Sequence, residues 1–436
     1  MYKRSEYHTI ITMNKKNSIY IIFILILCLQ SCVITKGIKY VNASVDDHSL
    51  FRQDTVHNGL QTFHFARNLE NEHLIDTPKF DIYLSKSDTL LNLTLRETMD
   101  YMDVPAAAIV IQNDTVLFEH YSGGWNEDSQ SCIFSVTKTI TSLLCGIALQ
   151  EGYIKSLNDP VTEYLPELKD ADPMFSQLQI EHLLDMTAGI KFKENYSSNP
   201  FSKMARLYLG NNSYKVIKNL KFSNKPGEIY SYKSATTAIL GMVIERATGK
   251  SYARYLSEKV WQPLGMEKSA LIGLDSDKHH VAKSYGGLTT NVRDLAKIGK
   301  LFLDNGSYNG TQIVDSSFVQ RCLSTNNAGI KSKGRYSYSW YWGFTDDEYN
   351  NGQKYFESKD SLVDYYRLNP VKGELDVWKN DNGYYVVIHN GGYWGFGLYG
   401  QVLYINPEKN MIAVFLGADR LEDFQILFDK ISVNLN

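Results

Sequence analysis

The sequence predicts an α+β fold, in which an antiparallel sheet is flanked by helices and interrupted by an inserted helical lobe. Three observations support this prediction. Two strand-like runs lie near residue 110, a long middle part is mostly helical, and two more strand-like runs precede an amphipathic C-terminal end. Because strands and helices that are segregated along a chain are typical of α+β architecture, we expect one large domain with two interleaved lobes.

The predicted strands form two pairs. Residues 106–112 and 115–121 are apolar runs around an Asn113-Asp114 turn, which predicts an antiparallel hairpin. A glycine-rich stretch over residues 389–401 leads into two further strands, at 402–407 and 411–417. These segments would supply the antiparallel sheet.

The predicted helices fill the middle of the chain. The helix over residues 235–248 has Ser234 as its candidate N-cap and Gly249 as its C-cap. The others are a helix from Ser135 to a stop at Gly152, a turn and short helix within 156–168, a helix over 180–190 that ends at Gly189, a helix from Ser251 that turns Tyr255, Val260 and Trp261 inward, a capped helix over 289–306, and an amphipathic segment over 421–433 that should cover the sheet.

The N-terminus is typical of an exported protein. Two lysines follow Met13, an apolar run covers residues 19–29, and Ser31 precedes Cys32. This pattern predicts a secretory signal, and the apolar run is short for a transmembrane span. The Leu-Gln-Ser-Cys sequence resembles a bacterial lipoprotein box, so we expect residues 1–32 to be a lipoprotein signal peptide with Cys32 as the lipidated residue. An uncleaved anchor and cleavage by the ordinary signal peptidase are the alternatives.

This leader predicts the location and the organisation of the chain. We expect a lipid-anchored protein of the cell envelope, on the inner or outer membrane and facing the periplasm or the exterior. Residues 33–78 are polar and weakly periodic at their start, which predicts a tether and an N-terminal extension. The main domain is then expected over residues 79–436.

Composition argues against several partners. A net charge of −3 over 436 residues provides no basic footprint for nucleic acid, and no phosphate-binding glycine loop is present. No third ligand stands at metal spacing to His279-His280, and Glu119-His120 lies at a strand end where a structural role is expected, so we expect no metal and no other cofactor. Three cysteines lie outside the leader, an odd number without metal-ligand spacing: Cys132, Cys145 and Cys322.

One tetrad, Ser135-Val136-Thr137-Lys138, carries the strongest chemical signal. A serine and a lysine three residues apart at a helix start lie on one face, one turn from each other. A lysine that burial keeps neutral can take the serine proton, and the helix N-terminus presents N–H groups that stabilise an oxyanion. The tetrad therefore predicts a serine acyl-transfer enzyme with Ser135 as nucleophile and Lys138 as base. The chain has no Gly-x-Ser-x-Gly elbow, which disfavours an α/β-hydrolase.

A second element is Tyr232-Lys233-Ser234, directly before the helix over residues 235–248. A tyrosine whose pKa is depressed beside a lysine can relay protons between nucleophile and leaving group. This pattern alone is also what an ordinary core tyrosine before a capping serine would show.

Five segments of the chain, in order, resemble the penicillin-binding, β-lactamase and DD-peptidase type of serine hydrolase. They are FSVTKTITSLLCGIALQEG, LNDPVTEYLPEL, HLLDMTAGI, YSYKSATTAILGMVIERATGKSY and YGGLTTNVRDLAKIGKLFLDNG. The resemblance extends from Asp103 to the C-terminus and implies a β-lactamase/DD-peptidase-like fold. The chain departs from the β-lactamase pattern because it has Tyr232-x-Ser234 in place of Tyr-x-Asn, and no late Lys-Thr-Gly.

These departures resemble the branch of 6-aminohexanoate-dimer hydrolases and esterases. The resemblance implies a catalytic trio of Ser135, Lys138 and Tyr232, and an oxyanion hole from the N–H groups of Ser135 and Leu398. The segment MTAGIKFKENY resembles the one that brings a tyrosine to the leaving group, which implies Tyr196. We expect Tyr196 and Ser234 to contact substrate. The segment 389–391, His-Asn-Gly, ranks second as the oxyanion strand.

The resemblance implies a small ester or amide as substrate. A D-alanyl cell-wall peptide is the alternative, favoured by the predicted envelope location and weakened by the missing Lys-Thr-Gly. A β-lactam ranks third. A ligand-binding module without catalytic activity on the same fold is the alternative from another class, and the retained serine, lysine and tyrosine argue against it.

Overall fold

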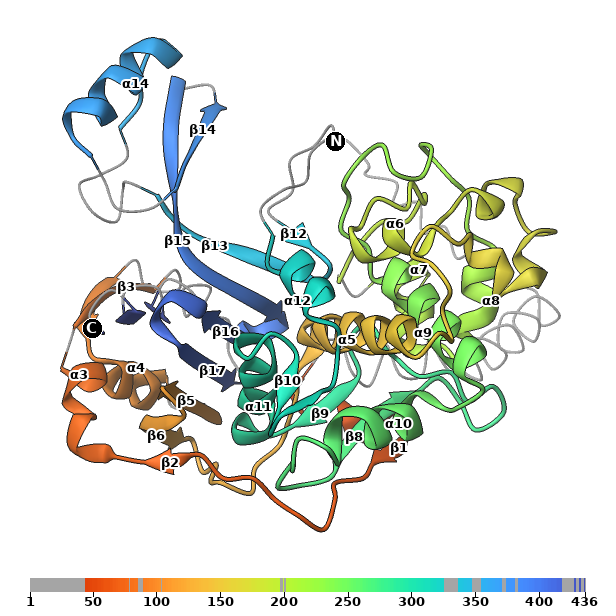
Figure 1. Cartoon of the computed structure of the whole chain (residues 1–436), viewed down its shortest axis with the longest axis horizontal. Helices are drawn as coiled ribbons and strands as arrows, with labels where there is room; N and C mark the ends of the chain where they lie inside the picture. Colours follow the sequence, from red (N-terminus) through yellow and green to blue (C-terminus); the bar gives the residue numbers. More distant parts are fainter. Residues whose placement is uncertain are drawn as a thin grey trace, which may run out of the picture.

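A large and mostly antiparallel sheet forms one side of the molecule (Figure 1). The computed structural model describes residues 44–77, 79–84, 89–102, 104–196, 199, 201–324, 336–346, 354–370, 374–380, 383–417, 427–428, 431–432 and 435. Among these residues the sheet consists of β2 (Ala66–Arg67), β5 (Ala106–Gln112), β6 (Thr115–Ser122), β12 (Tyr336–Ser337), β13 (Trp340–Asp346), β14 (Glu374–Asn380), β15 (Gly383–Gly397), β16 (Gln401–Asn406) and β17 (Met411–Gly417). The main strand order is β12-β13-β15-β16-β17-β5-β6-β2, with β14 also paired to β15.

Both predicted strand pairs are confirmed. β5 and β6 pair antiparallel across a turn at Asn113 and Asp114, whose φ angles are 49° and 59°. Two consecutive positive φ angles match the twist of a tight hairpin, which explains the Asn-Asp sequence. β16 and β17 also pair antiparallel, and the other edge of β17 pairs antiparallel with β5. Segments far apart in the sequence therefore build the centre of one sheet.

Helices fill the middle of the chain, as the α+β prediction requires. They are α5 (Thr137–Gln150), α6 (Ile180–Leu184), α7 (Lys203–Leu209), α8 (Ser213–Lys218), α9 (Ser234–Thr248), α10 (Tyr252–Leu256), α11 (Val292–Leu303) and α12 (Ser316–Cys322). In Figure 1, α6 to α9 lie on the side of α5 that faces away from the large sheet. Helix α11 packs on the sheet, where a side-chain carbon at Gly299 would come within 2.8 Å of Ile412.

Helix α5 is the buried centre of the molecule. All its residues from Thr137 to Ala148 are buried, and its apolar side chains join the main core. Its three threonine side chains are paired inside the protein. Thr141, for example, contacts the Ser284 carbonyl oxygen at 2.5 Å and the Tyr252 hydroxyl at 2.8 Å. Because burial of unpaired hydroxyl groups is costly, these contacts allow a helix with several threonines to lie within a core.

Several predicted helix boundaries are wrong. The helix predicted over 180–190 ends at Leu184, because Met186 adopts a positive φ of 56° that a helix does not accommodate. Residues 156–168 form two short 3-10 turns, Val161–Glu163 and Pro166–Leu168, where prolines interrupt the pattern.

The starts of two further helices differ from the prediction. Helix α11 begins at Val292 with Asn291 as its N-cap, since residues 288–290 form a strand. Helix α9 begins at Ser234 itself, and its N-cap is Lys233. The Gly249 C-cap is left-handed, as predicted. The helix after Ser251 is confirmed as α10, and Tyr255, Val260 and Trp261 are buried.

The N-terminal extension takes part in the fold. Strand β1 (Arg52–Val56) pairs antiparallel with β8 (Ala270–Leu274), in a second sheet of order β1-β8-β9-β7. The other two strands are β9 (Leu288–Thr290) and β7 (Ser131–Cys132). Earlier still, the Val45 carbonyl oxygen accepts a hydrogen bond from the Cys132 backbone N–H. Residues 44–56 therefore lie against the segment that leads to Ser135.

The remaining elements lie at the periphery of the molecule. In chain order they begin with α3 (His73–Asp76), which is followed by the paired strands β3 (Phe80–Leu84) and β4 (Thr89–Leu93). Helix α4 (Leu95–Met102) comes next. Helix α14 (Lys359–Leu368) and β14 project away from the body at the far end of β15 (Figure 1). Within the predicted C-terminal segment, Leu427, Phe428 and Ile431 are buried in a cluster with residues of β5, β16 and β17. The described part of that segment therefore covers the sheet.

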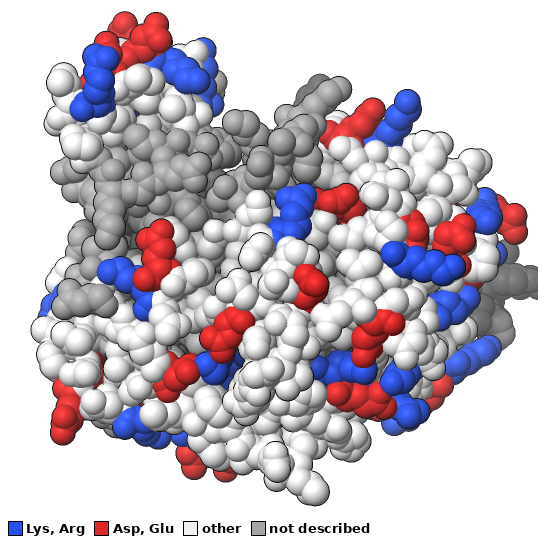
Figure 2. Space-filling view, in the orientation of Figure 1, with Lys and Arg blue, Asp and Glu red and all other residues white. Residues whose placement is uncertain are grey.

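The predicted leader and Cys32 lie outside the described residues. Within the part of the chain that the structure describes, no helix has the length and apolarity that crossing a membrane requires. On the face drawn in Figure 2, acidic and basic side chains lie close to one another over the body of the molecule.

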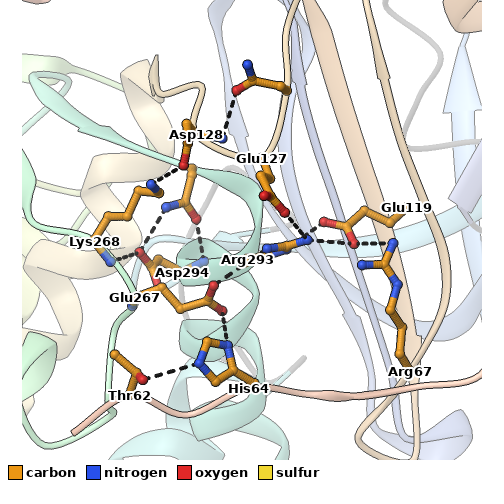
Figure 3. Close-up of polar contacts among 12 residues, drawn as sticks. Thr62, His64, Arg67, Glu119, Glu127, Asp128, Glu267, Lys268, Arg293 and Asp294 are labelled. Carbon is orange, nitrogen blue, oxygen red and sulfur yellow. Dashed lines mark hydrogen bonds and ion pairs between the residues drawn. The ribbon is translucent and has the colours of Figure 1, made fainter.

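A network of ion pairs joins β6, α11 and the N-terminal extension (Figure 3). Arg293 of α11 donates to Glu119 of β6 at 2.7 Å, and Arg67 of β2 reaches the same carboxylate at 3.0 Å. One turn further along α11, Lys297 contacts Asp294 at 3.2 Å and Glu267 at 3.3 Å. Each buried carboxylate here meets a cation, so the network stabilises the junction without leaving a charge unpaired.

Candidate active site

Ser135 lies at the entrance to the central helix. It is the middle residue of a 3-10 turn, Phe134–Val136, that continues directly into α5. From Ser131 to Ala148 every residue is buried except Ser135, which is partly exposed. The residue before it, Phe134, has a φ of 43°, a conformation that costs a non-glycine residue roughly 1–3 kcal/mol. The fold thus presents one hydroxyl group from an otherwise buried and strained turn.

Lys138 lies beside Ser135, as the spacing predicts. Its Nζ is 2.8 Å from the Ser135 Oγ and donates to the Tyr285 carbonyl oxygen at 2.6 Å. The side chain is 2% exposed, and no described carboxylate forms an ion pair with it. Burial lowers the pKa of Lys138 to about 7, and the negative charge of Glu194 has a smaller effect in the opposite direction. A substantial fraction of Lys138 is therefore neutral near pH 7 and can accept a proton.

Tyr232 completes the predicted trio in space. The Lys138 Nζ lies 5.0 Å from the centre of its ring, and Tyr336 packs edge-on against it with ring centres 6.1 Å apart. Burial raises the pKa of Tyr232 well above its usual value, while a hydrogen bond with Ser135 lowers it by less. The expectation of a depressed pKa is therefore wrong, because desolvation and most of the neighbouring groups disfavour the phenolate, and only the hydrogen bond with Ser135 favours it. Tyr232 keeps its proton and can donate it.

Glu194 is a neighbour of the site that the sequence analysis missed. Its carboxylate accepts three hydrogen bonds, from the Ser234 backbone N–H at 2.9 Å, the Ser234 hydroxyl at 2.6 Å and the Tyr196 hydroxyl at 2.5 Å. It therefore caps α9 from outside the helix, which explains why Lys233 can occupy the N-cap position without a side-chain cap. The only sequence signal was a carboxylate two residues before Tyr196.

The two predicted substrate contacts differ in their surroundings. Ser234 is buried and its hydroxyl is committed to Glu194. Tyr196 is 46% exposed, and burial and the charge of Glu194 raise its pKa by more than hydrogen bonds with Ser234 and Ser135 lower it. Tyr196 is thus partly open to solvent and close to the nucleophile.

The predicted oxyanion strand ends beside the nucleophile. Leu398 follows Gly397, the last residue of β15, and packs with Phe134 and Val45. A side-chain carbon at Gly397 would lie 2.5 Å from the Ile133 carbonyl oxygen, and one at Gly395 would lie 2.8 Å from the Thr139 Oγ1. The glycines of this stretch therefore permit a close approach of β15 to the start of α5.

The residues after Leu398 fasten this turn. Tyr399 has a φ of 60°, and its ring packs on Phe134 with centres 5.6 Å apart. Gln401 is fully buried, accepts from the Ser131 hydroxyl at 3.2 Å and donates to the Gly417 carbonyl oxygen at 2.6 Å. These contacts explain the Gly-x-x-Gly-Gln sequence, because they hold the turn to strands β7 and β17.

The other candidate residues lie elsewhere or have structural contacts. His389 and Asn390 belong to β15, and their side chains are outside what the structure describes. His279 is exposed and contacts Asn212 at 2.9 Å, whereas Glu119 belongs to the ion network of Figure 3. Cys132 is buried, and burial raises its thiol pKa to about 12. No group of three metal-binding side chains occurs among the described residues.

Comparison with protein families gives one match over most of the chain. The family model described as Beta-lactamase matches residues 94–427. The 6-aminohexanoate-dimer hydrolase of Paenarthrobacter ureafaciens is 29% identical over 263 residues, which cover 56% of this chain and 65% of that protein. The chain thus matches slightly less than two thirds of that relative's length. The flp protein of Staphylococcus aureus strain COL is 27% identical over 192 residues, covering 42% of this chain and 38% of that protein.

Solved structures share the fold. A Bacillus anthracis protein named as a 6-aminohexanoate-dimer hydrolase aligns over 89% of this chain and 92% of its own, with a TM-score of 0.68 and 22% identity. EstCE1, named as a hydrolase with promiscuous acyltransferase activity, aligns over 76% of this chain and 93% of its own, with a TM-score of 0.54 and 16% identity. The predicted antiparallel sheet flanked by helices, with a helical lobe, is therefore confirmed as the fold of this group.

Proposed function

Since this chain belongs to the β-lactamase family of hydrolases, we propose that it is a serine hydrolase that cleaves a small ester or amide through an acyl-enzyme on Ser135. The observation that carries the proposal is the 2.8 Å contact between the Nζ of the buried Lys138 and the Ser135 Oγ. The Paenarthrobacter relative is named a 6-aminohexanoate-dimer hydrolase, which supports an amide among the possible substrates.

The pKa directions support the following proton transfers. Lys138, with a pKa of about 7, is the base, because Tyr232 and Tyr196 hold their protons more tightly than free tyrosine does. In the first step the Ser135 O–H bond breaks, its proton passes to the Lys138 Nζ, and the Oγ bonds to the substrate carbonyl carbon. The former carbonyl oxygen, now negative, would accept hydrogen bonds from the Ser135 and Leu398 N–H groups.

The remaining steps release both products. The bond from carbon to the leaving nitrogen or oxygen breaks, and that atom takes a proton that Lys138 returns through the Tyr232 hydroxyl. Water then attacks the acyl carbon, gives a proton to Lys138, and the Ser135 oxygen leaves with that proton. Each step uses only groups of the trio, water and the two N–H donors.

Hydrolysis of 4-nitrophenyl butyrate by the full-length chain tests this function. Ser135→Ala should abolish release of nitrophenol, while Ser142→Ala, a buried serine further along the same helix, should retain it. Full activity in Ser135→Ala would refute the serine mechanism. If neither the natural chain nor Ser142→Ala turns the ester over, the proposal of a small ester or amide fails, and a narrow cell-wall peptidase or an inactive binding module gains weight.

We also propose that Cys32 carries a lipid that holds the protein in the cell envelope. The support is the lipoprotein-box sequence after a short apolar run. Cys32→Ser should move the protein out of the membrane fraction and change its intact mass by the lipid. An unchanged fraction and an unchanged mass would refute the anchor.

A further inference from the structure

The N-terminal extension contacts the two segments that are predicted to form the oxyanion hole. Val45, Cys132 and Phe134 are buried and form a small hydrophobic cluster that is distinct from the main core. Leu398, the residue after β15, packs against this cluster. Because Phe134 directly precedes Ser135, the cluster joins the segments that carry both predicted N–H donors.

The backbone of Val45 extends the small sheet that leads to the nucleophile. Its carbonyl oxygen accepts a hydrogen bond from the Cys132 N–H at 2.9 Å, whereas the next N–H along the chain, that of Ile133, donates to the Leu288 carbonyl oxygen at 2.9 Å. Successive N–H groups of an extended chain point to opposite edges. Strand β7 therefore has β9 on one edge and the extension on the other, three residues before Ser135.

The residues after Val45 are fastened to α7 and to the second sheet. The buried Asp47 carboxylate accepts a hydrogen bond from the Tyr208 hydroxyl at 2.8 Å. The Phe51 ring packs edge-on against the same tyrosine, with ring centres 5.2 Å apart. Strand β1 then pairs with β8 along its whole length. These contacts hold the Val45 side chain, which is 4% exposed, in one place within the cluster.

The two oxyanion segments need such support. Phe134 has a φ of 43° and Tyr399 a φ of 60°, conformations that a non-glycine residue keeps only where the surrounding contacts enforce them. Their rings pack on each other with centres 5.6 Å apart. One left-handed residue thus stands next to each predicted donor, Ser135 and Leu398, and both pack in the cluster that contains Val45.

We propose that Val45 of the N-terminal extension is a positioning residue for catalysis, which fixes the two halves of the oxyanion hole relative to each other through Phe134 and Leu398. The inference rests on the proposed serine hydrolase and adds a residue to its machinery. Oxyanion donors act only where they point at the developing charge, so a small shift of either segment weakens transition-state binding more than substrate binding. The extension thus takes part in catalysis as well as in the fold.

Val45→Ala in the full-length chain tests the inference, with Val56→Ala as the matched control. Val56 is fully buried in the same extension, but it packs in the main core. We expect Val45→Ala to lower kcat for 4-nitrophenyl butyrate about tenfold and to leave KM within about twofold, a smaller loss than the roughly 10²–10³-fold effect of removing a whole donor. Val56→Ala should lower the temperature of thermal unfolding and leave kcat unchanged.

A mimic of the transition state reports on the oxyanion hole directly. The carbonyl carbon of 1,1,1-trifluoropentan-2-one, which shares the butyryl group of the ester, bonds to the Ser135 Oγ. The serine proton passes to Lys138, and the carbonyl oxygen becomes an oxyanion that the two N–H groups bind. The inhibition constant of this ketone should rise about tenfold in Val45→Ala and stay unchanged in Val56→Ala.

A conservative variant separates the shape of the side chain from stability. Val45→Thr keeps the branched shape and places a hydroxyl group in the hydrophobic cluster. We expect this variant to unfold at a lower temperature, because burial of a hydroxyl group is costly, and to retain kcat and affinity for the ketone. A role in stability alone would give the opposite ranking of Val45→Thr and Val45→Ala in activity.

The outcomes are distinct. An unchanged kcat and inhibition constant in Val45→Ala, or an equal loss of kcat in Val56→Ala, would overturn the inference and leave the serine hydrolase intact. Activity that persists in Ser135→Ala would overturn the proposed function, and the inference with it. A parallel loss of kcat and ketone affinity in Val45→Ala, with both kept in Val45→Thr, would establish it.

A second variant keeps the test decisive if Val45→Ala does not fold. Tyr208→Phe retains the ring in the cluster and removes the hydrogen bond that fastens Asp47. The looser extension should lower kcat and ketone affinity in parallel, by less than Val45→Ala. Normal values of both in a folded Tyr208→Phe would overturn the inference.

Discussion

Two buried lysines, Lys138 of α5 and Lys297 of α11, differ in the groups that contact their amines. Both are about 1–2% exposed. Lys297 lies within 3.3 Å of Asp294 and Glu267 and also donates to the Gly265 carbonyl oxygen. Lys138 meets a hydroxyl and a carbonyl oxygen, and no described carboxylate lies within ion-pair distance of it.

This difference in partners decides what each lysine can do. A carboxylate at contact distance favours the ammonium form, whereas burial without one favours the neutral amine. The contacts of Lys297 join α11 to the segment around Glu267, and the positive charge lies beside two carboxylates. Lys138 is buried without a described carboxylate at ion-pair distance, and its pKa therefore falls to about 7. The same residue type thus serves stability in one place and chemistry in the other.

The largest expected effect is on catalysis at Lys138. Lys138→Met keeps the side-chain length and removes the base, so kcat/KM for 4-nitrophenyl butyrate should fall by on the order of 10⁴-fold, since nucleophile and base act as a unit. The free energy of unfolding should change by no more than about 1 kcal/mol, because no partner charge is left behind. Initial rates and urea denaturation measure the two quantities. A variant with near-normal activity would contradict the role of Lys138 as base.

At Lys297 we expect a large loss of stability in place of a loss of catalysis. Lys297→Met leaves Asp294, which is fully buried, without its cation, and should lower the free energy of unfolding by about 3–5 kcal/mol. Lys300→Met is the matched control on the same helix, since its partners Asp114 and Asp304 are exposed, and it should cost about 1 kcal/mol or less. Urea denaturation measures both losses. If Lys297→Met and Lys300→Met lower the free energy of unfolding equally, burial of the Lys297–Asp294 pair does not decide the loss.

A third prediction tests the geometry around Ser135 apart from charge. Gly397→Ala would place a carbon 2.5 Å from the Ile133 carbonyl oxygen and push the Leu398 N–H from its position. We expect kcat/KM to fall by about 10²–10³-fold, the usual effect of losing one oxyanion donor. Gly59→Ala, where the nearest atoms would lie at 3.5 Å, serves as the control. If Gly397→Ala retains full activity, the end of β15 is not part of the oxyanion hole.

The smallest expected effect is a shift in pH dependence. Because neutral Lys138 is the active form, kcat/KM should rise with pH through a midpoint near 7 and then level off. Glu194 raises the pKa of Lys138, so Glu194→Gln should move this midpoint to lower pH, by up to about one unit. Glu163→Gln, at an exposed position, should leave the midpoint in place. A midpoint that moves upward would refute the electrostatic role of Glu194.

The sequence predicted the elements that local patterns specify. The hairpin over residues 106–121 follows from its apolar runs and its Asn-Asp turn, and the helix after Ser135 follows from apolar spacing. Boundaries failed where distant contacts decide them. The helix predicted to reach Gly189 ends early, and Asp185, just after it, is buried against Arg321 at 3.2 Å. No local pattern contains that partner.

The same division holds for the site. Spacing alone placed Ser135 and Lys138 on one helical turn, because three residues along a helix bring side chains together wherever the helix lies. The family pattern added Tyr232, Tyr196 and Leu398 as expectations. Only the tertiary structure brought these segments to Ser135, introduced Glu194, and reversed the expected pKa direction of Tyr232. A pKa depends on how much water and which charges surround a group, and both are set by parts of the chain far apart in sequence.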